Sequence, residues 1–178
     1  MSGHNKWSQI KEQKSKTDAQ KSKIFSLYAK IITLEAAKAK GDKNAPGLKT
    51  AIERAKAFNV PNDNIDRAVK KGMGSETGNM EEVIYEAYGP GGVAFLMEGI
   101  TDNKNRMTQE IKHLLSKHGG NLGGQGSVMW AFQKDAERYS PITPMELAKS
   151  DRVAVRRLFE ELEEHEDIKN IYLNANID

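Results

Sequence analysis

Residues 83–101 read VIYEAYGPGGVAFLMEGIT, and this stretch decides the fold class of the second half of the chain. Two runs rich in β-branched and aromatic residues, 83–88 and 93–101, flank a cluster of glycine and proline at 89–92. Such runs favour strands, and a short Gly/Pro cluster between them favours a tight turn. The stretch therefore predicts a β-hairpin.

The sequence after this hairpin alternates helix and strand patterns. Apolar residues recur at helical spacing over 105–118 and again over 153–164, whereas 127–132 and 168–173 have the composition of strands. The resulting order is β-β-α-β-α-β. It predicts an α+β domain of about four strands and two helices, with an antiparallel or mixed sheet and the helices on one face.

The sequence before the hairpin has the pattern of a helical bundle. Helical spacing of apolar residues predicts one helix over about 17–40 and a second that begins at Pro46. A third short helix, capped by Asn62 or Asp63, is predicted to close at Gly72. Residues 1–20 carry few apolar groups, so we expect an N-terminal arm before the bundle.

Charge divides the chain at the same place as the predicted change of fold. Residues 1–75 contain 16 Lys and Arg against 7 Asp and Glu, a net charge of +9. Residues 76–178 contain 11 against 18, a net charge of −7. We therefore predict a basic helical domain, 1–75, and an acidic α+β domain, 76–178. A cationic block points to nucleic acid or an anionic membrane as its partner.

Composition narrows the function classes further. The longest apolar run, 93–97, is too short to cross a bilayer, so nucleic acid is the expected partner and a membrane is not. The chain has no cysteine, and its first residues lack the apolar region of a secretory signal. These features predict a cytoplasmic protein without a disulfide framework.

The lysines near the N-terminus are the candidate nucleic-acid-binding residues. Lys16, Lys23 and Lys30 are seven residues apart, a spacing that keeps side chains on nearly one line of a helix. Lys14 and Lys21 form a second such row. A row of ammonium groups can follow phosphates without reading bases, and an aromatic ring can stack on an exposed base. The full predicted set is Lys6, Trp7, Lys11, Lys14, Lys16, Lys21, Lys23 and Lys30. The alternative is a solvated polar helix face, with Trp7 packed against the bundle.

Catalytic and metal-binding motifs do not stand out. The glycine-rich segment 118–127 lacks the lysine of a phosphate-binding loop and precedes a predicted strand instead of a helix, so a flexible connection is expected. The four histidines, His4, His113, His118 and His165, show no metal-ligand spacing. Arg106 is predicted to be free to bind a ligand. We expect no enzyme activity, no cofactor, no metal and no small-molecule substrate.

Eight stretches resemble the YebC/PmpR family. They are GHNKWSQIK (3–11, followed by Lys14 and Asp18), AIERAK (51–56), NVPNDNI (59–65), RAVKKG (67–72), YEAYGPGG (85–92), TDNKNR (101–106), GSVMWAF (126–132) and DIKNIY (167–172). The resemblance implies a helical N-terminal domain followed by α+β domains in a cytoplasmic regulator of gene expression. Members are described as DNA-binding transcriptional regulators, and others, including a mitochondrial relative, resemble translation factors that act at the ribosome.

The chain departs from this family at one place. Members usually insert a third α/β domain between the segments that correspond to 127–132 and 153–164, and here only a connection near 133–152 separates them. The resemblance and the charge pattern together predict a nucleic-acid-binding regulator of gene expression. Two alternatives remain: a translation factor that binds ribosomal RNA at the ribosome, and a protein-interaction module that uses the acidic domain.

Overall fold

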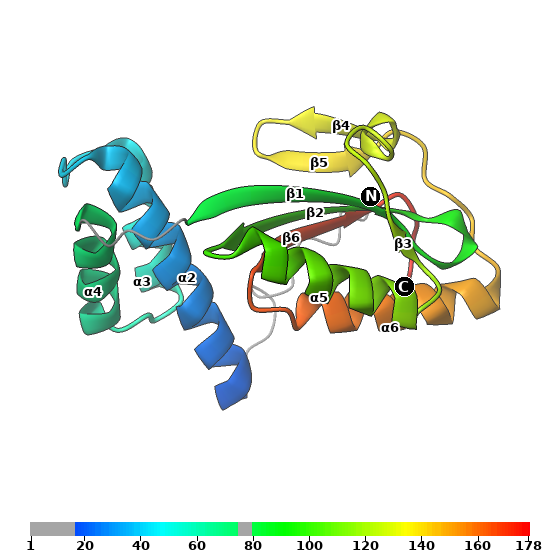
Figure 1. The fold of residues 1–178 in the computed structure, drawn as a ribbon, viewed down its shortest axis with the longest axis horizontal. Coiled ribbons are helices and arrows are strands. Elements are labelled where there is room, and N and C mark those ends of the chain that lie inside the picture. The colour runs from blue at the N-terminus through cyan, green and yellow to red at the C-terminus, as the bar shows by residue number, and fades with distance from the viewer. Residues whose placement is uncertain (1–16, 75–79) are drawn as a thin grey trace. The chain divides into compact units, whose positions relative to one another are not determined.

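The computed structural model describes residues 17–74 and 80–178 (Figure 1). The chain divides into two compact units. Among the described residues, the helical unit contains 17–74, 80–82 and 100–103, and the α+β unit contains 83–99 and 104–178. No helix in these described ranges is long and apolar enough to span a membrane.

The helical unit consists of three helices whose ends follow from local sequence. They are α2 (Asp18–Ala39), α3 (Pro46–Ala57) and α4 (Asn62–Met73). The Thr17 hydroxyl accepts from the Gln20 amide while the Gln20 side chain accepts from the Thr17 amide, a reciprocal cap that starts α2. Lys40 ends it in the left-handed conformation with φ of 49°. The predicted helices over 17–40 and from Pro46 are confirmed.

The predicted cap of the third helix is wrong. Pro61 occupies the N-cap position of α4, and no side chain caps this helix. The Pro61 carbonyl instead accepts from the amides of Asn64 and Ile65, at 3.0 and 3.2 Å. Asn62 is already inside the helix, because the fixed φ of Pro61 sets the direction in which the chain enters it.

A four-stranded sheet forms the centre of the α+β unit, and its strand order is β3-β1-β2-β6. The chain contributes β1 (Glu81–Tyr88), β2 (Ala94–Thr101), β3 (Asn121–Leu122) and β6 (Ile168–Leu173). Strands β1 and β2 are adjacent and joined by a short turn in which the Gly89 amide donates to the Val93 carbonyl. The hairpin at 83–101 and the last strand are therefore confirmed.

The sheet carries a different layer on each face (Figure 1). Helices α5 (Lys104–Lys117) and α6 (Lys149–Glu163) cover one face. Alternate β1 residues, such as Val83 and Tyr85, point into the core on that side. The opposite face is covered by the short helix η2 (Met129–Ala131) and a small two-stranded sheet of β4 (Phe132–Asp135) and β5 (Arg138–Pro141). The predicted α+β class, with four strands and two helices, is confirmed.

Two predictions for the segment between α5 and α6 are wrong. Residues 127–132 form no sheet strand, because they contain η2 and only Phe132 belongs to β4. The edge strand is instead β3, inside the predicted glycine connection, where Leu122 lies opposite Ala87. The connection expected near 133–152 contains most of the β4–β5 hairpin.

Candidate nucleic-acid interface

The helical unit carries the excess positive charge of the described chain. Residues 17–74, which hold the three helices, contain 12 Lys and Arg against 6 Asp and Glu, a net charge of +6. Glu81, Glu82 and Asp102 also belong to the helical unit and lower its net charge to +3, while the α+β unit contains 11 Lys and Arg against 14 Asp and Glu, a net charge of −3. Phosphate backbones bind such cationic surfaces through long-range attraction. Of the two described units, the helical unit therefore has the net positive charge that attracts the phosphates of nucleic acid.

Three of the predicted binding residues lie on helix α2. Lys23 and Lys30 are seven residues apart on one unbroken helix, so they lie along nearly the same line, and both are half-buried. Lys21 is exposed. The other predicted residues lie outside the described part of the chain: Lys6, Trp7, Lys11, Lys14 and Lys16.

Helices α3 and α4 add exposed lysines that were not in the predicted set. Lys49 and Lys56 are seven apart on α3, and Lys70 and Lys71 lie in the last turn of α4. None of these four ammonium groups pairs with a carboxylate in the described residues. Glu53 lies between the two α3 lysines and offsets part of their charge. The seven-residue spacing of Lys49 and Lys56 is the sequence signal that could have identified them.

Lys38 differs from these lysines because it is held by carboxylates of its own unit. Its ammonium group lies 2.8 Å from Glu35 and 3.3 Å from Glu82. Burial lowers the pKa of Lys38, but the hydrogen bonds and charges of the two carboxylates outweigh it, so the pKa is raised overall. Lys38 thus remains charged while its charge is already compensated.

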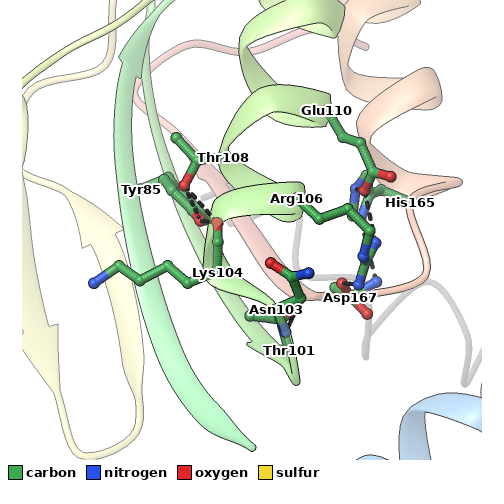
Figure 2. Close-up of polar contacts among 9 residues, drawn as sticks. All are labelled: Tyr85, Thr101, Asn103, Lys104, Arg106, Thr108, Glu110, His165 and Asp167. Carbon is green, nitrogen blue, oxygen red and sulfur yellow. Dashed lines mark hydrogen bonds and ion pairs between the residues drawn. The ribbon is translucent and has the colours of Figure 1, made fainter. Parts of the chain in front are cut away.

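Arg106 is not free to bind a ligand, contrary to the prediction. It donates to Glu110 at 2.8 Å within α5 and to Asp167, just before β6, at 2.5 Å (Figure 2). The Asp167 side chain is only 1% exposed. A buried carboxylate needs a charged or hydrogen-bonding partner, so Arg106 fixes the start of α5 against the start of β6.

The same network contains three groups that could coordinate a metal. Ligand atoms of Glu110, His165 and Asp167 lie within 4.8 Å of one another. The sequence did not suggest this cluster, because its members come together only through tertiary packing across 55 residues. The guanidinium of Arg106 bonds to both carboxylates and supplies the positive charge that a metal would bring. We therefore describe the cluster as an ion-pair network and not as a metal centre.

The glycine-rich loop after α5 binds an anionic group, but that group belongs to the protein itself. The Glu86 carboxylate, on β1, accepts from the backbone amides of Gly126, Val128 and Met129 at 2.6, 2.8 and 2.9 Å. Glu86 is 5% exposed. The Glu86 carboxylate thus occupies the backbone amides that a bound phosphate would need. The prediction of a flexible connection is wrong, because these hydrogen bonds fix the loop to the sheet.

Comparison with known proteins identifies the family to which this chain belongs. Residues 5–75 match the sequence model of the TACO1/YebC N-terminal domain, and residues 80–138 match that of the TACO1/YebC second and third domain. The chain belongs to the TACO1/YebC family. The two matches meet close to the change from the basic half to the acidic half.

Individual TACO1/YebC relatives support this assignment. A probable transcriptional regulatory protein of Thermoanaerobacter pseudethanolicus is 54% identical over 136 residues, which are 75% of this chain and 55% of that protein. A protein of the same description from Syntrophus aciditrophicus is 56% identical over 137 residues. The chain thus spans about half the length of the curated relatives that it matches.

A solved structure has a similar fold. The crystal structure of a conserved hypothetical protein from Aquifex aeolicus superimposes with a TM-score of 0.85 at 30% sequence identity. The match covers 96% of both chains, so it includes the helical unit and the α+β unit.

Proposed function

We propose that this TACO1/YebC protein is a nucleic-acid-binding regulator of gene expression and that its helical unit makes the contact. The observation that carries the proposal is the net charge of +6 on residues 17–74, together with exposed lysines that have no carboxylate partner in the described chain. Two relatives are described as probable transcriptional regulatory proteins, which agrees with this role.

The proposed mechanism is contact with phosphates and not readout of bases. Lys21, Lys23 and Lys30 of α2, with the predicted lysines before it and the exposed lysines of α3 and α4, follow the backbone of the nucleic acid. Lysine is a mobile point charge, whereas reading of base edges uses the planar groups of arginine, asparagine and glutamine. The acidic α+β unit would then orient the complex or bind a protein partner, and the inserted third domain would be reduced to the connection near 133–152.

Duplex DNA is the first candidate partner because of the relatives' description. Ribosomal RNA is the second, since recognition of RNA by shape and phosphate also needs no base readout. Sedimentation with ribosomes in the presence of excess duplex DNA separates the two. Association that survives the competitor indicates a translation factor, and transfer of the protein to DNA indicates a transcriptional regulator.

The salt dependence of binding tests the proposal directly. Replacing the exposed Lys21, Lys49 and Lys56 by Gln removes three of the proposed phosphate contacts, so the slope of log K against log salt on duplex DNA should become less steep by about 2.7. The matched control replaces Lys104, Lys149 and Lys169 of the α+β unit by Gln and should leave the slope unchanged. Equal effects of the two sets, or binding without salt dependence, would contradict the proposed mechanism and favour a protein-interaction module.

A further inference from the structure

Residues 123–141, here called the strap, form a separate layer on the sheet face opposite α5 and α6 (Figure 1). The strap contains the end of the glycine-rich loop, η2 and the β4–β5 hairpin. Within the described residues, β4 and β5 pair only with each other. The strap is therefore attached to the four-stranded sheet without a shared ladder of backbone hydrogen bonds.

Glu86 of β1 binds the start of the strap through both its side chain and its main chain. The carboxylate accepts from the amides of Gly126, Val128 and Met129, and the main-chain carbonyl accepts from the Gly123 amide at 2.8 Å. Hydrogen bonds to an ionised group are stronger than those between neutral groups, and a buried carboxylate depends on them. One residue of the sheet thus holds residues 123–129.

The other contacts between the strap and the sheet are mainly apolar and form a small cluster. The Tyr88 hydroxyl adds one hydrogen bond, to the Ser127 carbonyl at 2.6 Å. The buried members of the cluster are Val128, Ala131, Phe132 and Tyr139 on the strap, and Ala94, Leu96 and Tyr172 on the sheet. The larger cluster, between the sheet and its two helices, contains no residue of the strap. The sheet, α5 and α6 therefore have a core of their own.

The β4–β5 hairpin depends on the sheet for its stability. Its ladder has four residue pairs, and a lone two-stranded hairpin is only marginally stable in water. Loss of contact with the sheet should therefore unfold the hairpin in the same event. The loop before η2 has room to move, because a Cβ atom at Gly124 or Gly126 would meet nothing within 4 Å.

We propose that the strap opens from the sheet and closes again as one unit while the sheet and its two helices stay folded, and that the Glu86 carboxylate holds it closed. Opening breaks the three amide bonds to this carboxylate together and exposes Ala94 and Leu96 to water. Glu86 itself becomes hydrated when the strap leaves, so its charge is not penalised in the open state. The inference does not depend on nucleic-acid binding.

Native-state amide hydrogen exchange of the full chain, followed by NMR in low concentrations of urea, tests the proposal. In the wild type, the Val128 and Met129 amides and the ladder amides of β4 and β5 should share one free energy of opening. This free energy should be lower than that of β2 and β6.

A variant pair tests the role of Glu86. Glu86→Gln should speed exchange in the strap by about 30-fold and change β2 and β6 much less, because a neutral amide oxygen does not replace a carboxylate that accepts three bonds. The matched control is Glu98→Gln. Glu98 accepts from Asn170 and Tyr172 of β6, at 2.7 and 3.3 Å, so its loss should leave exchange in the strap unchanged.

Three results would overturn the proposal. Strap amides with the same free energy of opening as β2 and β6 would show that the whole α+β unit opens together. Glu86→Gln without faster exchange in the strap, or with equal acceleration in β2 and β6, would show that Glu86 does not hold the strap closed. Val128 and Met129 amides that open separately from the β4–β5 ladder would show that the strap is not one unit. The first and last results are read on the wild type, so they do not depend on the folding of a variant.

Discussion

Arg106 has a structural role that the charge of its partner explains. Asp167 is almost completely buried, and its carboxylate is bonded to the guanidinium at 2.5 Å. Removing one member of such a pair leaves an uncompensated buried charge. We therefore expect Arg106→Met to lower the free energy of unfolding by about 3 kcal/mol, measured by urea denaturation.

Arg157 provides a matched control for this substitution. It lies exposed on α6 and has no ion pair in the described part of the chain. Arg157→Met should change the free energy of unfolding by less than about 0.5 kcal/mol. Equal losses in the two variants would show that the Arg106–Asp167 pair is not what stabilises this end of the sheet.

His165 makes the stability of the protein sensitive to mild acid. Burial lowers the pKa of His165, and this effect outweighs the opposing hydrogen bond to Glu110 and the charges of Glu110 and Asp167, while Arg106 lowers the pKa further. The unfolded chain therefore takes up a proton at a higher pH than the folded chain does. The resulting stability is present above the ordinary histidine pKa of about 6.5 and is lost as the pH falls below it.

The test compares urea midpoints at pH 7.5 and pH 5.5. The wild-type midpoint should fall on acidification, and that of His165→Gln should fall less because the titrating group is gone. His113→Gln, at an exposed position on α5, should behave as the wild type does. An identical pH dependence in all three proteins would assign the acid sensitivity to other groups.

At the level of elements, the crossing of α2 and α4 depends on a glycine. A Cβ atom at Gly72 would lie 2.3 Å from the Thr33 carbonyl oxygen and 2.6 Å from the Ala36 Cβ atom. Neither neighbour is a flexible side-chain end, so the helices would have to separate. Gly72→Ala should therefore destabilise the protein by about 1–3 kcal/mol in urea denaturation, although alanine favours a helix more than glycine does.

Gly124→Ala is the matched control for Gly72→Ala. A Cβ atom at Gly124 would meet nothing within 4 Å. Its effect on the urea midpoint should be small. If Gly72→Ala proved neutral or stabilising, close backbone packing would not be the reason for glycine at this position.

The helices and strands could be predicted from the sequence where the local pattern was strong. Apolar spacing identified α2 and α3, and residue composition identified the β1–β2 hairpin and β6. The strand predicted over 127–132 failed because the amides of Val128 and Met129 bond to a side chain of β1 instead of a neighbouring strand. A composition rule has no information about such a partner, which lies more than forty residues away.

For the whole molecule, two cores imply two regions of independent stability. The α+β unit has its own cluster of buried residues around Phe95, Ile111 and Leu158, and the helical unit buries Leu27, Ile32 and others in α2 to α4. Gly72→Ala should therefore speed amide hydrogen exchange in α2 and α4 more than in β2 and β6. Exchange that accelerates equally in both units would show that they unfold together.

The sequence by itself determined the charge division and the helical and α+β classes, because each depends on composition or on spacing along one segment. Eight matching stretches indicated the family. Tertiary structure alone decided that Arg106 pairs with Asp167, that the glycine-rich loop binds Glu86 and that Trp130 stands exposed. These outcomes join groups from separate elements. Their energies depend on burial and on distances across the fold, which no local pattern specifies.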